Sequence, residues 1–131
     1  MKVLSWNVNS IRVRKDQLLS VIKEESPDII CLQETKTIND LFPREKLEKT
    51  GYFVYVNGVQ SYNGVAIISK FEANKISSHK FCNQNDARHI QANFKNFSIH
   101  SIYVPAGGDI PDVTNNEKFG HKLKFLDEMA E

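Results

Sequence analysis

The stretch that decides the fold is PDIICLQETK, residues 27–36. It opens with a proline, which interrupts a helix, and continues with the unbroken apolar run of residues 29–32. A short apolar run in this setting predicts a buried strand. Gln33, Glu34 and Lys36 follow directly, without a glycine or another turn signal. The pattern therefore predicts a buried strand that delivers an amide, a carboxylate and an ammonium to one edge of a sheet.

The chain on either side of this stretch predicts a mixed α/β domain. Apolar and polar side chains alternate over residues 3–8, which predicts a first strand, and residues 16–25 carry the apolar stripe of a helix. The strand–helix–strand order indicates parallel pairing through a right-handed crossover. From residue 52 hydrophobicity repeats with a period of two residues, which indicates strands, expected to be antiparallel. These strands are YFVYVNG (52–58), GVAIISK (64–70), NKISSHKF (74–81), HIQANF (89–94) and FSIHSIYV (97–104).

Two further helices are expected. NDLFPREKLEKTG, residues 39–51, predicts one short helix that Gly51 ends. A C-terminal helix is expected from about Glu117, with its apolar face formed by Phe119, Leu123, Leu126 and Met129. No stop signal follows before Glu131, which is equally compatible with a chain cut short and with a terminal helix docked on its own domain.

Composition is that of a soluble globular protein with one domain. Of the 131 residues, 40% are hydrophobic and 25% are charged, and the net charge of +1 excludes a uniformly basic DNA-coating protein. A local basic patch stays compatible with it. Cys31 and Cys82 form no CxxC pair, and Cys31 is interpreted as a buried free thiol. Without a signal-peptide pattern or an apolar run of membrane length, a cytoplasmic location without membrane attachment is expected.

Three polar residues follow apolar strands at positions suited to chemistry. Asn7 and Glu34 come at the carboxyl ends of the first two strands, where α/β sheets tend to bind ligands, and Tyr103 follows SIHSI. A carboxylate and an amide suit Mg²⁺, and a tyrosine hydroxyl suits a phosphate oxygen. A turn asparagine, a solvated glutamate and a half-buried core tyrosine are the ordinary alternatives, and spacing alone does not decide between them.

PDIICLQETK resembles the strand signature of the exonuclease III family of apurinic/apyrimidinic (AP) endonucleases, within the DNase I-like endonuclease/exonuclease/phosphatase superfamily. Four more stretches agree in order: SWNVNSIRVR, LFPREKLEKTGY, YNGVAIISK and IYVPAGG. The resemblance covers essentially the whole chain. It implies one αβ half of a four-layer αββα sandwich, with a mixed sheet covered by helices on one face. Residues 1–131 would be the N-terminal half of a single domain whose C-terminal half is absent.

The resemblance also implies roles for individual residues. Glu34 matches the metal-binding glutamate, Asn7 the asparagine beside it, and Tyr103 the tyrosine that contacts the scissile phosphate; the metal is Mg²⁺, with Mn²⁺ as an alternative. Arg88 matches an arginine of the DNA-facing loop. Gln33 and Lys36 belong to the signature and would hold Glu34 in place, and Lys36 is also a candidate for substrate binding. A first loop near the DNA backbone corresponds to Arg12, Arg14 and Lys15, for which a solvated basic loop is the alternative.

The implied activity is hydrolysis 5′ to abasic sites and 3′-to-5′ exonuclease action on double-stranded DNA by a monomer. Another phosphoesterase of the superfamily, acting on lipid or inositol phosphates, and a non-catalytic product of a truncated gene are the alternatives. The family's Gly-Asp-x-Asn and Ser-Asp-His motifs do not occur, Ala106 replaces a usual asparagine, and Asp109 lacks a following Asn. The 131-residue chain alone is therefore expected to be inactive, and the inner face of its sheet to be exposed.

Overall fold

A computed structural model describes all 131 residues, and the chain divides into two compact units. The first unit comprises residues 1–79 and 86–103, and the second comprises residues 80–85 and 104–131. The first unit contains β1 (Val3–Asn7), α1 (Ile11–Glu25), β2 (Ile29–Gln33), η1 (Asn39–Leu41), α2 (Arg44–Glu48), β3 (Phe53–Asn57), β4 (Val65–Ser69), β5 (Lys75–Ser77), β6 (His89–Asn93) and β7 (Ser98–Ile102). The second contains η2 (Phe81–Asn83) and α3 (Glu117–Ala130).

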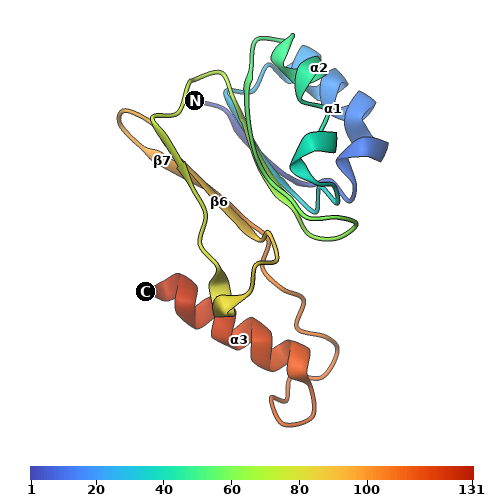
Figure 1. Ribbon diagram of the computed structural model, residues 1–131, viewed down its shortest axis with the longest axis vertical. Coiled ribbons are helices and arrows are strands. Elements are labelled where there is room, and N and C mark those ends of the chain that lie inside the picture. Colours follow the sequence, from blue (N-terminus) through green and yellow to red (C-terminus); the bar gives the residue numbers. More distant parts are fainter. The chain divides into compact units, whose positions relative to one another are not determined.

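The first unit holds two sheets and two covering helices. One sheet has the strand order β1-β2-β4-β3, in which β1 and β2 are parallel and the remaining pairs are antiparallel. The other has the order β5-β6-β7 and is antiparallel throughout. Helices α1 and α2 lie on one side of the first sheet, and β6 and β7 lie on its other side (Figure 1). The mixed α/β class and the parallel start expected from the sequence are confirmed.

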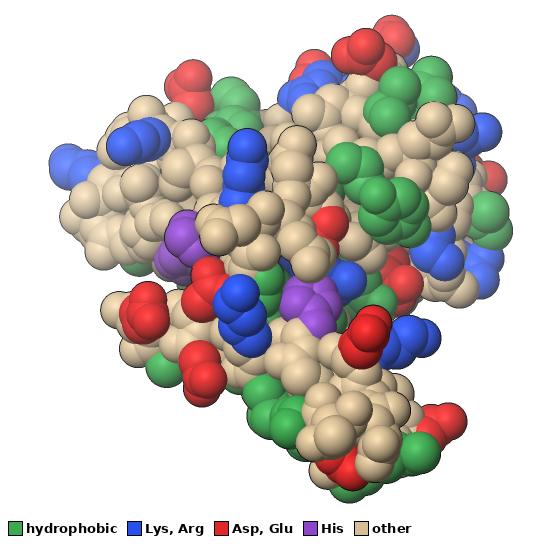
Figure 2. All heavy atoms as spheres, turned by 60° about the horizontal axis from the view of Figure 1, so that its bottom comes forward, with side chains coloured by type: hydrophobic (Ala, Val, Ile, Leu, Met, Phe, Trp, Pro, Cys, Tyr) green, Lys and Arg blue, Asp and Glu red, His purple; other side chains and the backbone are tan.

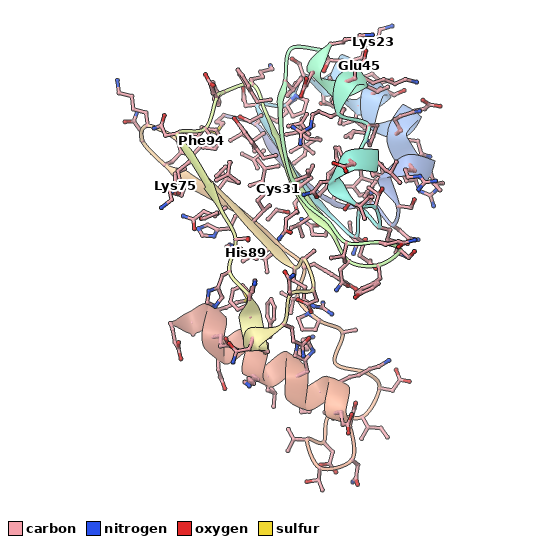
Figure 3. The ribbon with its side chains drawn as sticks, viewed as in Figure 1. Lys23, Cys31, Glu45, Lys75, His89 and Phe94 are labelled. Carbon is pink, nitrogen blue, oxygen red and sulfur yellow. The ribbon has the colours of Figure 1, made fainter.

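The central strands β2 and β4 are buried on both faces. Ile30 and Leu32 of β2 face the helices and pack with Leu18 and Leu47. Their neighbours along the strand face the second sheet, in a cluster formed by Ile29, Cys31, Val65, Ile67, Ile90, Ala92 and Phe94. Figure 3 shows Cys31 on the side of the first sheet that faces β6, with His89 and Phe94 near the two ends of that strand. A continuous apolar run is what a strand covered on both sides requires.

The expectation that the inner face of the sheet would be exposed was therefore wrong. The chain carries its own second sheet, and Ile90 and Ala92 of β6 close the inner face of the first. The interpretation of Cys31 as a buried free thiol is confirmed, because it is 5% exposed and forms no disulfide. Burial raises the pKa of this thiol to about 11, which keeps it neutral and chemically inert near neutral pH.

Helix boundaries differ from the expected ones in two places. Helix α1 begins at Ile11 rather than Asp16, because the Ser10 hydroxyl accepts a hydrogen bond from the backbone N–H of Val13 and caps it. The expected single helix over residues 39–51 is divided into η1 and α2, with Pro43 at the start of α2. Proline has no N–H to donate and is tolerated only at the start of a helix, which explains the break.

The second unit is built around α3. Asn116 caps this helix by accepting hydrogen bonds from the N–H groups of Lys118 and Phe119, as the expected start near Glu117 requires. The expected apolar face is only partly correct. Phe125 is fully buried, with its ring centroid 4.4 Å from that of Phe81, whereas Leu123, Leu126 and Met129 are each about 40% exposed. None of the helices in the chain is both long enough and apolar enough to cross a membrane.

The packing between the two sheets predicts a large cost for Ile67→Ala. Ile67 is fully buried in the cluster between the sheets, so its truncation leaves a cavity and lowers the free energy of unfolding by about 2–4 kcal/mol. Ile76→Ala on β5 is the matched control, because Ile76 is 38% exposed, and its loss stays within about 1 kcal/mol. Urea unfolding followed by circular dichroism measures both values. Equal losses in the two variants contradict the double burial of β4.

Candidate functional site

Asn7 and Glu34 lie at the same edge of the first sheet. Asn7 ends β1 and pairs with Gln33, the last residue of β2, and Glu34 follows at once. Backbone hydrogen bonds continue beyond the strands, from Val8 N–H to the Gln33 carbonyl (2.9 Å) and from Ser10 N–H to the Glu34 carbonyl (2.8 Å). The parallel pairing thus places the amide and the carboxylate on adjacent loops at the carboxyl ends of their strands, as predicted.

Tyr103 reaches this edge from the second sheet. It follows β7 directly, and its backbone N–H donates to the Arg88 carbonyl at 2.8 Å. Burial raises the pKa of Tyr103, the negative charge of Glu34 raises it further, and Arg88 opposes both effects. The hydrogen bond from Gln33 to Ser101, at 3.0 Å, joins the ends of β2 and β7 and so places Glu34 and Tyr103, which follow those strands, at the same edge. The Tyr103 hydroxyl remains protonated, and able to donate a hydrogen bond, at neutral pH.

Arg88 is held beside Tyr103 by an acidic neighbour. Its Nε donates to Oδ2 of Asp86 at 2.6 Å, and both side chains are only about 15% exposed. The guanidinium carbon stands 4.9 Å from the centroid of the Tyr103 ring, a cation–π geometry. The family resemblance implied that Arg88 belongs to a DNA-facing loop, and the structure brings it into direct contact with Tyr103. Asp86 was missed, although an acidic residue two positions before an arginine is a visible local signal.

Arg12 and Lys36 line a hollow of about 200 Å³ next to this edge, together with Thr37 and Gln60. Lys36 Nζ donates to Oδ1 of Asn9 at 2.6 Å, a neutral partner that leaves its charge uncompensated. Arg12 forms no ion pair, and the Thr37 hydroxyl is buried without a hydrogen-bond partner. The hollow therefore offers the uncompensated positive charge of Lys36 and Arg12 to an anionic ligand.

The three basic residues expected in the first loop belong to a helix instead. Arg12, Arg14 and Lys15 lie in the first turns of α1 rather than in a loop, because Ser10 starts the helix early. On the face drawn in Figure 2, basic and acidic side chains are interspersed, which agrees with the net charge of +1. Any anion-binding role therefore depends on individual positions such as Arg12.

Gln33 supports the site without facing a ligand. Its side-chain Nε2 donates to the Ser101 hydroxyl of β7 at 3.0 Å, and that hydroxyl donates to the Leu32 carbonyl at 2.9 Å. Ser101 is 1% exposed. These two bonds join β2 to β7 one residue before Glu34 and two residues before Tyr103. These bonds are compatible with the expected role of Gln33 in holding Glu34 in place.

Several residues at this edge have a strained backbone. Glu34 (φ 54°), Lys36 (φ 56°), Asn63 (φ 52°) and Ala87 (φ 54°) all occupy the left-handed region without being glycine. Each costs of the order of 1 kcal/mol and persists only where surrounding contacts determine it. Positive φ values also occur away from this edge, at Ser26, Cys82 and Asn83, so strain alone does not define a site; here it accompanies the polar residues of the Glu34 and Arg88 loops.

The chain belongs to the Endonuclease/Exonuclease/phosphatase family, whose sequence pattern matches residues 4–129. Within that family it is similar to exodeoxyribonuclease III of Haemophilus influenzae, with 31% identity over 137 aligned residues. That alignment takes in 100% of this chain and 50% of the relative. The exonuclease III resemblance found in the sequence is thus confirmed, and the chain spans about half the length of this relative.

Two solved structures match the fold. An AP endonuclease from Archaeoglobus fulgidus shares 36% identity at a TM-score of 0.87, covering 98% of this chain and 49% of that one. The 3′ phosphatase NExo from Neisseria was solved with a product DNA hairpin and shares 31% identity at a TM-score of 0.81. That match covers 100% of this chain and 53% of the NExo chain. These matches confirm that the chain has the fold of one half of a DNase I-like AP endonuclease.

Beside Arg88, a histidine pair predicts a pH-dependent stability. His89 is 5% exposed; its Nδ1 accepts from the His79 N–H at 2.8 Å, so its proton is on Nε2, 2.9 Å from Nδ1 of His100. Burial, with repulsion from His100 and His79, lowers the pKa of His89 to about 4. The unfolded chain, with a histidine pKa of about 6.5, then binds more protons than the folded chain, so the free energy of unfolding falls as the pH falls from about 6.5 to 4.

The expected loss attributable to His89 is about 2 kcal/mol between pH 7 and pH 5. Urea unfolding of the chain and of His89→Gln at both pH values isolates this contribution, because other titrating groups are common to the two proteins. A glutamine cannot take up a proton, so the variant should show the smaller dependence on pH. The same dependence in both proteins contradicts a depressed pKa at His89.

Proposed function

We propose that this chain is the N-terminal half of a Mg²⁺-dependent DNA-repair nuclease that cleaves 5′ to abasic sites and removes nucleotides from 3′ ends. The observation that carries the proposal is the meeting of Glu34, Asn7 and the Arg88–Tyr103 pair at one edge of the fold. Membership of the Endonuclease/Exonuclease/phosphatase family supports it, as does the likeness to an AP endonuclease. A cytoplasmic location and a monomeric full-length protein belong to the same proposal.

The donor atoms at this edge fit Mg²⁺, with Mn²⁺ as an alternative. Nowhere in the chain do three His, Cys, Asp or Glu side chains form a group that could enclose a metal. Mg²⁺ does not need one, because it keeps several waters and takes one or two protein oxygens together with phosphate. Glu34 supplies the carboxylate and Asn7 the amide oxygen. When bound, the ion would neutralise negative charge that develops on the phosphate oxygens during hydrolysis.

Tyr103 and Arg88 would act on the same phosphate group. The raised pKa of Tyr103 keeps its hydroxyl protonated, so it donates a hydrogen bond to a nonbridging oxygen. Arg88 is fixed by Asp86 at 2.6 Å, and it adds positive charge beside the tyrosine ring without reorganising during the reaction. Preorganised donors of this kind stabilise the transition state of phosphodiester hydrolysis.

Arg12 and Lys36 would bind the DNA backbone outside the reaction centre. Both line the same hollow, and neither charge is compensated by a carboxylate. Backbone phosphates of double-stranded DNA are the anions that a nuclease substrate brings to such a place. The NExo structure supports DNA as the substrate class, since that relative was solved with a DNA hairpin.

Water activation is the part of the reaction for which this chain offers no residue. The Gly-Asp-x-Asn and Ser-Asp-His motifs expected to supply the base and a phosphate-binding histidine do not occur in the sequence. Asp109 lacks the following asparagine and belongs to the second unit, so we do not assign it this role. We therefore propose that the 131-residue chain alone does not hydrolyse DNA.

A nicking assay on an abasic-site duplex tests the proposed function. The 131-residue chain with Mg²⁺ should leave the duplex intact, whereas a hybrid that continues into the second half of the Haemophilus relative should nick it. Glu34→Ala in the hybrid should lower the rate about 100-fold or more, because the metal loses its only carboxylate from this chain. EDTA is the control for metal dependence, and circular dichroism verifies that each protein is folded.

Two results would contradict the proposal. Mg²⁺-dependent nicking by the 131-residue chain alone would show that it supplies its own base. A folded hybrid that nicks equally well with and without the Glu34→Ala substitution would remove Glu34 from the metal site.

DNA binding by the chain alone gives a test of Arg12 that needs no catalysis. Loss of one phosphate contact should reduce the slope of log K against log salt by about 0.9, so Arg12→Ala weakens binding most at low salt. Fluorescence anisotropy with a labelled duplex at several salt concentrations measures the slope. Lys23→Ala, on the last turn of α1, is the matched control and should leave the slope unchanged. Identical slopes for Arg12→Ala and wild type contradict the assignment.

A further inference from the structure

The turn formed by Asn63 and Gly64 lies between the two strained loops of the candidate site. Asn63 is only 8% exposed although it belongs to a surface connection that precedes β4. Its φ of 52° and the φ of 90° at Gly64 place both residues in the left-handed region. Asparagine followed by glycine suits such a turn, because both residues tolerate this conformation.

On one side the turn is bonded to the loop that carries Glu34. The backbone N–H of Lys36 donates to the Asn63 carbonyl at 2.9 Å, and the N–H of Thr35 donates to the Gly64 carbonyl at 3.1 Å. The contact is close enough that a Cβ at Gly64 would lie 2.2 Å from Oγ1 of Thr35. The turn therefore packs directly on the two residues that follow Glu34.

On its other side the turn is bonded to the loop that carries Arg88. Nδ2 of Asn63 donates to the Asp86 carbonyl at 2.8 Å, and the Gly64 N–H donates to the Ala87 carbonyl at 3.0 Å. Asp86 in turn holds Arg88 through its carboxylate. One turn thus connects the carboxylate loop of the first sheet to the arginine loop that leads into the second.

We propose that Asn63 is a positioning residue, which holds the Glu34 loop and the Asp86–Arg88 loop in their strained conformations relative to each other. Glu34 and Ala87 both have positive φ values, and backbone in that state persists only where neighbouring groups determine it. The bonds through Asn63 and Gly64 supply that determination for both loops at once. The inference rests on the proposed function in one respect, namely that Glu34 binds a metal ion.

Asparagine combines two properties that this position requires. It tolerates the left-handed backbone, and it carries an amide N–H₂ that reaches the Asp86 carbonyl. Asn63→Gly keeps the backbone conformation accessible and removes the side chain. Asn63→Asp keeps the size and the tolerance for positive φ, and removes the donor. Both substitutions therefore remove the hydrogen bond while the backbone conformation stays accessible, and Asn63→Asp adds a carboxylate that repels the Asp86 carbonyl.

Asn57→Ala is the matched control. Nδ2 of Asn57 also donates to a backbone carbonyl at the start of β6, that of His89, at 2.9 Å. Both bonds run from an asparagine amide to a backbone carbonyl, from Asn63 to Asp86 in the loop before β6 and from Asn57 to the first residue of β6. No hydrogen bond joins Asn57 to the loop after Glu34. A general loss of stability from a broken amide–carbonyl bond should appear in both positions, and a positioning effect only at Asn63.

Two measurements on the 131-residue chain test the proposal. Amide hydrogen exchange at Thr35, Lys36 and Ser10 follows the Glu34 loop without any metal, after correction for global stability measured by urea unfolding. Both Asn63 variants should lose protection at these amides about tenfold, and Asn57→Ala should not. Mn²⁺ affinity measured by electron paramagnetic resonance should fall about tenfold in Asn63→Gly, stay unchanged in Asn57→Ala, and be lost in Glu34→Gln.

Each outcome decides the question. Protection in a folded Asn63 variant that matches Asn57→Ala overturns the proposal, as does lost protection with unchanged Mn²⁺ affinity. Failure of both Asn63 variants to fold would make Asn63 a purely structural residue and would also overturn it. If wild type binds no Mn²⁺ that depends on Glu34, the metal assignment under the proposed function fails, and the exchange data still decide whether Asn63 positions the loop.

Discussion

Burial of β2 and β4 on both faces is the constraint on which the rest of this structure depends. Ile30 and Leu32 pack toward the helices, while Ile29 and Cys31 pack toward the second sheet. One packed layer on each side holds these strands against any shift of register, since a slip by one residue would turn each side chain to the opposite face of the sheet. Because the strands are fixed, the positions of the residues that directly follow them are fixed as well.

The residues of the candidate site are positioned by the ends of these packed strands. Glu34 directly follows β2 and Tyr103 directly follows β7, so each is placed by the end of a strand rather than by a long loop. The bonds from Gln33 to Ser101 and from Ser101 to Leu32 tie these two strands together close to the site. Strained backbone in the loops beyond is sustainable because the strands beneath them do not yield.

Much of this arrangement could be predicted from residue patterns. The strands follow from hydrophobic period, and the positions of Asn7 and Glu34 follow from strand–helix–strand order, because parallel strands end at the same edge. The errors arose where local patterns had two solutions. The Ser10 cap lengthened α1, and Phe125 rather than Leu123 became the buried residue of α3, because the packing partner of a helix decides which side is covered.

The sequence by itself determined the strands, their polar endings and the family to which the chain belongs. Only the tertiary structure decided that the inner face of the first sheet is covered, that Asp86 holds Arg88 against Tyr103, and that Asn63 joins two loops. The physical reason is the distance along the chain between interacting residues. Periodicity and turn chemistry act over a few residues, whereas Asn63 and Asp86 are 23 residues apart, and such partners are brought together only when the sheets pack.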